Sequence, residues 1–126
     1  MIDDTIYSTI WLGMKKNKCV ILVPTQYNDG MPVPEKVIVG IKREIDEAFD
    51  GHHVAGVGEG AYRMADGSMA YDPTLEIWIA VRSDQTDQVR NLARKLARML
   101  KQESIWFEIT NSQVEFVEPN EETGFE

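Results

Sequence analysis

Leucine, isoleucine, valine or phenylalanine occupies every second position in two segments of the chain, residues 74–82 and residues 104–110. An alternation with a period of two places successive side chains on opposite faces of a strand, so both segments predict β-strands. A third segment, residues 18–25, is continuously apolar up to Pro24, which is typical of a strand buried on both faces. The apolar positions of the two alternating segments are Leu75, Ile77, Ile79, Val81, Ile105, Phe107 and Ile109.

Apolar residues recur at helical spacing in residues 35–49 and, most clearly, in residues 85–101. Pro34 suits the first turn of the first helix and Gly51 its end. Ser83 or Asp84 is expected to cap the second helix. The sequence therefore predicts two amphipathic helices, each following a strand.

Residues 53–65 have strand character, and the dipeptide Asp66-Gly67 that follows is a strong signal for a two-residue hairpin turn. Such a turn would pair Met64 with Met69 and Tyr62 with Tyr71. These four side chains would then share one face of the hairpin.

Short additional strands could form in residues 6–12 and 114–117. No linker divides the chain, so we expect a single domain over residues 1–118 and a flexible acidic tail over residues 119–126.

The predicted order is β-α-β-β-α-β, an α+β fold with an antiparallel sheet. Right-handed crossovers would place both helices on one face of that sheet. The other face would carry two tryptophans and two glutamates, and it is too apolar to be left in water. A second copy of the chain, a partner protein, the chain's own ends or a ligand could cover it. The residues concerned are Glu76, Trp78, Trp106 and Glu108.

This layout resembles the ferredoxin-like superfamily over residues 18–110, including the dimeric α+β barrels in which two sheets pack face to face. The stretches GEGAYRMADG (58–67) and KQESIWFEI (101–109) are also similar to a small uncharacterised bacterial family with the same element order. Neither stretch is an active-site motif, so the resemblance implies a fold and no functional residues.

The chain of 126 residues carries a net charge of −8, and the five glutamates of residues 115–126 account for most of it. An acidic protein repels phosphate backbones, so nucleic-acid binding is not expected. No apolar stretch reaches the length of a membrane span, and the N-terminus lacks the basic region of a secretory signal. We therefore expect a cytoplasmic protein.

Few residues suggest catalysis. Adjacent residues on a strand point to opposite faces, so His52 and His53 are not expected to share a metal, and neither a metal nor a cofactor is predicted. Cys19 lies in an apolar strand, which does not suit a nucleophile. The glycines at 56, 58 and 60 lack the lysine of a phosphate-binding loop.

Two groups of side chains could still bind or react with a ligand. Glu76 and Glu108 share a partly apolar face and could perform acid–base chemistry, although rim positions, solvated or paired with arginine, are the favoured interpretation. Around the hairpin, Tyr62, Arg63 and Tyr71 could bind a carboxylate or phosphate, or could simply be a solvated arm.

The leading functional hypothesis from the sequence is a small acidic interaction domain that dimerises or docks on a partner protein through Trp78 and Trp106. An inhibitor, immunity or accessory protein of a mobile element would fit this description, and no enzymatic activity is favoured. The alternative is a small-molecule-binding or enzymatic dimeric α+β barrel that uses Glu76 and Glu108 in a cavity.

Overall fold

The computed structural model describes residues 16–119. Along the chain, the elements are β1 (Lys16–Pro24), α2 (Glu35–Phe49), β2 (His53–Arg63), β3 (Met69–Val81), the short 3-10 helix η1 (Ser83–Gln85), α3 (Thr86–Met99) and β4 (Phe107–Val114). The fold is α+β, and the element order is the one that the sequence pattern predicts.

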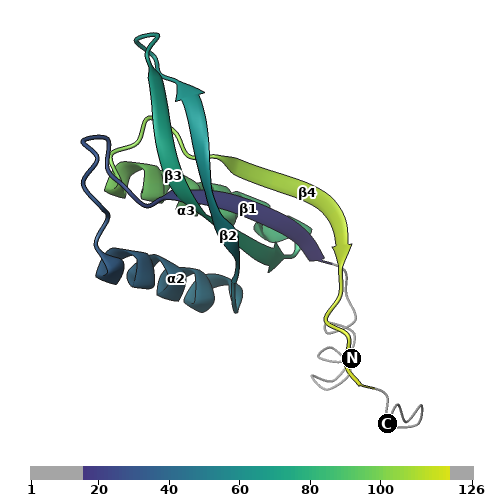
Figure 1. Ribbon diagram of the computed structural model, residues 1–126. Helices are drawn as coiled ribbons and strands as arrows, with labels where there is room; N and C mark the ends of the chain where they lie inside the picture. Colours follow the sequence, from purple (N-terminus) through teal and green to yellow (C-terminus); the bar gives the residue numbers. More distant parts are fainter. Residues whose placement is uncertain (1–15, 120–126) are drawn as a thin grey trace.

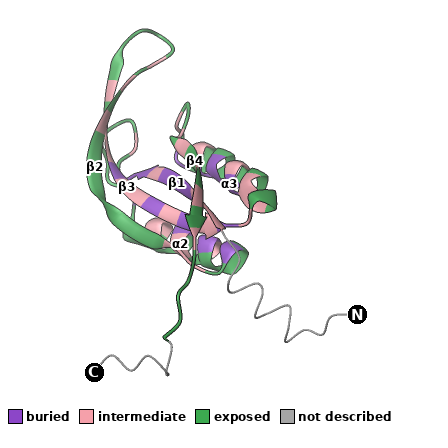
Figure 2. Ribbon diagram, turned by 90° about the vertical axis from the view of Figure 1, so that its right-hand side faces the viewer, coloured by how far each residue is buried: buried purple, intermediate pink, exposed green. Residues whose placement is uncertain are grey.

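The four strands form one antiparallel sheet in the order β2-β3-β1-β4. The connection from β1 to β2 through α2 passes β3, and the connection from β3 to β4 through α3 passes β1. Figures 1 and 2 show both helices against the same face of the sheet. The opposite face carries no helix, and we call it the open face.

The hydrophobic core lies between the sheet and the two helices. Alternate residues of β1 and β3 point into it, and the helices contribute their apolar stripes. The strand residues are Cys19, Ile21, Val23, Ile77, Ile79 and Val81, and the main helix residues are Ile41, Ile45, Phe49, Val89, Leu92 and Leu96. The intervening residues of both strands therefore face the open side.

The hairpin between β2 and β3 differs from the prediction. Arg63 pairs with Met69 and Tyr62 with Ala70, one residue away from the expected register. The Gly67 amide donates to the Met64 carbonyl and the Met64 amide to the Ser68 carbonyl, and Gly67 has a φ of 90°. This is a three-residue turn closed by a left-handed glycine rather than a two-residue turn.

One residue more in the turn moves alternate side chains to the other face. Tyr62 therefore lies on the open face. Tyr71 lies on the opposite face, where the hairpin extends past the helices, and it is 75% exposed. The predicted pairing of Tyr62 with Tyr71, and of Met64 with Met69, is wrong for this reason. The Asp66 carboxylate accepts hydrogen bonds from the Ser68 amide and hydroxyl, which lower the pKa of this exposed group.

Several element boundaries also differ. Ser83 and Asp84 form η1 instead of capping α3, because the Gln85 side chain accepts a hydrogen bond from the Arg82 amide (3.1 Å). β4 begins at Phe107 rather than at residue 104 and ends at Val114, so the extra strand predicted for residues 114–117 does not form. The strand predicted for residues 6–12 and most of the predicted tail lie outside the described residues.

Candidate functional site

The open face is organised by the strand register. Across β1, Leu22 lies opposite Glu76 of β3, and its amide donates to the Trp106 carbonyl on the other side (3.2 Å). Val20 lies between Trp78 and Glu108 in the same way. Both tryptophans therefore lie on the face away from the helices, where the alternation places them.

Two hollows open on this face and share the residues Leu22, Tyr62 and Thr74. The first, of about 140 Å³, lies between the hairpin and the loop that precedes β4. The second, of about 340 Å³, runs along β2 from residue 55 to residue 60 and reaches Glu76. The two hollows adjoin at these shared residues, and we call them together the Tyr62 groove.

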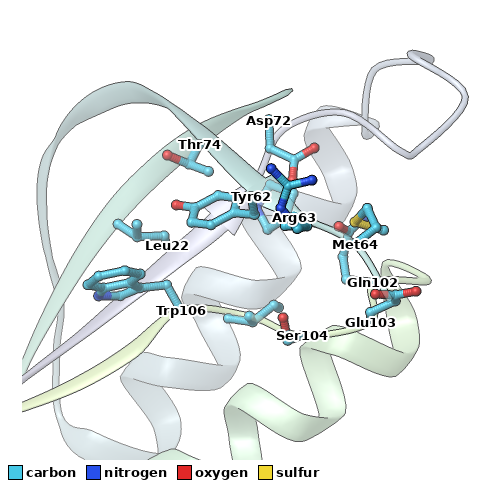
Figure 3. A pocket seen from close by; sticks show the side chains of 12 residues that line it. Leu22, Tyr62, Arg63, Met64, Asp72, Thr74, Gln102, Glu103, Ser104 and Trp106 are labelled. Carbon is cyan, nitrogen blue, oxygen red and sulfur yellow. The ribbon is translucent and has the colours of Figure 1, made fainter. Parts of the chain in front are cut away.

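The first hollow is shown in Figure 3. Tyr62, Thr74, Leu22 and Trp106 gather on one side of it, and Met64, Gln102 and Glu103 lie on the other. Arg63 and Asp72 also line it. The hollow thus combines apolar and aromatic side chains with a few polar ones, which is the usual composition of a small-molecule site.

The position of Tyr62 is set by a glycine two residues before it. A methyl group at position 60 would overlap the hydroxyl and ring of Tyr62, so only glycine leaves room for the phenol to lie along the strand. Position 58, on the same strand, has open space around it. The sequence Gly60-Ala61-Tyr62 therefore holds the phenol over the groove.

The carboxylate of Glu76 is half-buried and lies beside the second hollow. It accepts a hydrogen bond from the Trp78 indole Nε1 at 2.5 Å. Because both residues lie on the same face of β3, the indole holds the carboxylate on the open side of the sheet. Glu76 therefore contributes a carboxylate, held in place by the indole, to the lining of the second hollow.

The hairpin is fastened to the rest of the molecule at its tip. The Ala65 amide donates to Glu103 Oε2 at 3.1 Å, and this carboxylate lies on the loop before β4. Within the arm, Arg63 Nη1 donates to the Gly67 carbonyl at 2.7 Å. These contacts close the first hollow on one side and fix the arm that carries Tyr62.

The structure does not bring all the predicted residues together. Glu108 is exposed and accepts hydrogen bonds from Trp106 Nε1 and Thr110 Oγ1, both at 3.3 Å. Neither hollow of the groove includes Glu108. Within residues 16–119, β1 lies between the two strands that carry Glu76 and Glu108, so the two carboxylates do not line the same hollow of the groove.

The two histidines contact neighbouring side chains, and the cysteine is buried. His52 Nδ1 contacts Asp46 Oδ1 at 2.5 Å, and the His53 ring lies 5.4 Å from the Trp78 ring. Burial raises the pKa of the Cys19 thiol to about 11, with an opposing effect of Arg90, so the thiol stays protonated at neutral pH. Within residues 16–119, no three histidine, cysteine or acidic side chains are placed to hold a metal ion.

No helix in this part of the chain is long and apolar enough to cross a membrane.

Sequence reasoning missed several residues of the groove. Leu22 was noticed only as part of an apolar strand, and Asp72, Thr74 and Glu103 were not selected at all. Leu22 could have been found, because a strand that is apolar on both faces must also contribute to the open face. The role of Glu103 depends on a contact across 38 residues, which no local pattern reveals.

No protein-family model matches the chain, and no curated protein matches it significantly in sequence. Solved structures do share its fold. A phage SAM lyase in complex with S-methyl-5'-thioadenosine is 20% identical with a TM-score of 0.64, over 78% of this chain and 82% of that one. A phage SAM lyase in the apo state is 16% identical with a TM-score of 0.53, over 85% and 94% of the two chains.

These structures correct the functional hypothesis from the sequence. The interaction domain is wrong as the leading interpretation, because both solved structures described above are of an enzyme and one holds a small molecule. The expectation that leaned away from enzymatic activity is wrong on the same finding. The comparison favours the small-molecule alternative, and the chain shares the fold of phage SAM lyases.

Proposed function

We propose that this chain is a lyase that binds S-adenosylmethionine, or a closely related sulfonium nucleoside, in the Tyr62 groove and releases S-methyl-5'-thioadenosine. One observation carries the proposal. Tyr62 and the half-buried carboxylate of Glu76 line one groove, in a fold shared with enzymes that act on this type of molecule.

The charge of the groove supports a cationic ligand. Its lining includes the carboxylates of Glu59, Asp72, Glu76 and Glu103, and of all its lining residues only Arg63 is basic. S-adenosylmethionine carries a positive charge on its sulfur and another on its amino group. A chain with a net charge of −8 attracts such a cation over a distance, and Glu76 can hold it at contact.

The apolar part of the groove supports a purine. Leu22 and Trp106 lie on the same side of the first hollow as Tyr62. Aromatic rings bind a planar base through stacking and also attract a nearby cation through their faces. The indole of Trp106 is 52% exposed, so it is accessible to a ligand.

The reaction requires no oxidant, metal or water. The bond between the sulfonium sulfur and the γ-carbon of the methionine chain breaks, and its electron pair stays on sulfur as a neutral thioether. In one route, the substrate's own carboxylate forms a bond to the γ-carbon, which closes a lactone. In the other, the neighbouring carbon loses a proton and a double bond to the γ-carbon forms, which leaves an alkene. Atoms and charge balance in both routes.

Tyr62 and Glu76 would have different tasks. The phenol can hydrogen-bond the substrate at the junction of the two hollows and fix its conformation, which is the main requirement for closing a ring. Glu76 would hold the substrate's ammonium group or, in the alkene route, accept the proton. The mass of the second product distinguishes the two routes.

The test is turnover of S-adenosylmethionine by purified protein, followed by mass spectrometry of both products. Tyr62→Phe and Glu76→Gln should each lower the rate by about 100-fold or more, the size expected for loss of a positioned proton donor or charge. Glutamine keeps an acceptor for the Trp78 indole, so the fold should survive.

Tyr71→Phe and Glu108→Gln are the matched controls, because they make the same chemical changes outside the groove. A sample without protein measures the spontaneous decay of the substrate. The proposal fails if wild-type protein does not exceed that background, or if the groove variants are as active as the controls.

We also propose that the fold is the ferredoxin-like split β-α-β arrangement. The sheet order read from the β4 edge is 4-1-3-2, with every neighbour antiparallel. Each β-α-β unit leaves a gap that one strand of the other unit fills, which supports this assignment.

A further inference from the structure

A second pocket lies at the opposite end of the open face from the Tyr62 groove, with a volume of about 690 Å³. The ladder between β2 and β3 begins at the pair His53–Trp78, so β3 continues beyond it as Ile79–Val81. The turn from α2 into β2 walls the pocket on this side. The beginning of β1 and the segment at the end of β4 line the pocket on its other side.

The pocket offers an apolar surface large enough for an aromatic ring. Phe49 and Ile79 are buried core residues at its base, and Trp78 is half-buried. Phe116, which follows β4, is 58% exposed and lines the rim. Burying such rings against a ligand is favourable.

The polar lining of this pocket is basic, in contrast to the carboxylates of the Tyr62 groove. It consists of Lys16, Lys18, His52 and His53 with one acid, Asp50. The Lys18 ammonium lies 3.9 Å from the centroid of the Trp78 ring, and the Lys16 ammonium 5.2 Å from that of Phe116. Within residues 16–119, no carboxylate lies within ion-pair distance of Lys18.

Lys18 thus presents a positive charge directly above an aromatic surface. A cation held by a ring face retains donors on its other side, because the ring occupies only one direction. A ligand whose apolar body lies against the exposed parts of Trp78 and Phe116 can place an acidic group against this ammonium and form a charge-assisted hydrogen bond.

We propose that this pocket binds a small organic anion, with its aromatic or apolar body against Trp78 and Phe116 and its carboxylate or phosphate against Lys18. The site is separate from the Tyr62 groove and does not depend on the function proposed for that groove. It would select ligands of opposite charge to those of the groove.

The test uses 1-anilinonaphthalene-8-sulfonate, an aromatic anion whose fluorescence rises when it is bound. We expect saturable binding with one molecule per chain, and amide shifts in an NMR titration centred on residues 50–53 and 78–80. N-phenyl-1-naphthylamine, which has the same rings without the charge, should bind at least about tenfold more weakly. Competition with 1-naphthoate and 1-naphthyl phosphate shows whether carboxylate or phosphate is preferred.

Lys18→Met removes the charge and keeps the stem, and it should weaken binding of the anion about tenfold or more. Lys36→Met, on the exposed surface of α2, is the matched control and should bind like wild type. Equal binding of the neutral and anionic probes, an unchanged affinity in Lys18→Met, no displacement by either naphthyl compound, or shifts outside this pocket would each overturn the proposal.

Discussion

The α-carbon of Gly60 lies directly beside the phenol of Tyr62, and no larger residue fits without moving that ring. This contact explains why position 60 is a glycine. Glycines otherwise weaken a strand, since they pack no side chain and raise the entropic cost of folding. The glycine leaves space for the ring, so its importance lies in the position of Tyr62 rather than in stability.

Gly60→Ala should therefore lower turnover about tenfold or more while the thermal unfolding midpoint changes by only a few degrees. The added methyl group displaces the Tyr62 ring, which is the flexible partner, and the substitution itself restricts the unfolded chain. Activity assays and thermal unfolding measure the two effects. Gly58→Ala, with open space around it, should retain both activity and stability.

If Gly60→Ala is as active as Gly58→Ala, the position of the Tyr62 ring does not matter for the reaction. If it fails to fold, the NMR spectrum of Gly60→Ala combined with Tyr62→Ala, which removes the clashing ring, decides whether the strand rather than the ring is at fault.

For single residues, the sequence correctly predicted the face of a side chain where large aliphatic or phenylalanine side chains occupy every second position of a strand. The faces of Glu76, Trp78 and Trp106 follow from the period of two, and the structure has them as predicted. Tyr62 and Tyr71 were misplaced because Gly67 closes a three-residue turn, and the same dipeptide signal fits either turn. A single residue in the turn decided the face of the most important side chain.

The hairpin of β2 and β3 is an arm whose tip is held by a single side chain of another element. Glu103 accepts the Ala65 amide, and it lies on the loop between α3 and β4. Because that loop also lines the first hollow, the contact fastens together two walls of the groove. The shape of the groove thus depends on a link between elements that are distant in sequence.

Glu103→Ala should increase the hydrogen-exchange rate of the Ala65 amide about two- to tenfold, the size expected for one lost hydrogen bond. Core amides of β1 should exchange as in wild type, because the sheet ladder does not involve Glu103. The control is Glu47→Ala on the exposed face of α2. Unchanged exchange at Ala65, measured by NMR, would show that the arm needs no such fastening.

The elements themselves were largely predictable. The helix at residues 35–49 was predicted to the residue, because Pro34 and Gly51 mark its ends. β3 proved longer than its alternating core, since Asp72-Pro73 continues the strand rather than ending it. The link between Glu103 and the hairpin, like the two hollows, arises only when the elements pack.

For the whole molecule, the open face divides into two regions of opposite charge. Carboxylates line the Tyr62 groove at the hairpin end, and lysines line the pocket beside Lys18 and Trp78 at the other end. Trp78 lies between them, since its Nε1 donates to Glu76 while its ring lies beneath Lys18. The net charge of −8 and the exposed tryptophans suggested a protein partner, but this division of charge fits small ligands better.

The account depends on the Tyr62 groove recognising a positive charge beside an adenosine. The most direct test compares sinefungin, which carries an ammonium group near the position of the sulfonium, with S-adenosylhomocysteine, whose sulfur is an uncharged thioether, by calorimetry and NMR. Neither compound can undergo the cleavage. We predict that sinefungin binds at least about tenfold tighter, or about 1.4 kcal/mol. Its amide shifts should centre on residues 58–62 and 74–76. Equal affinities, or shifts confined to the helices or to residues 50–53, would contradict it.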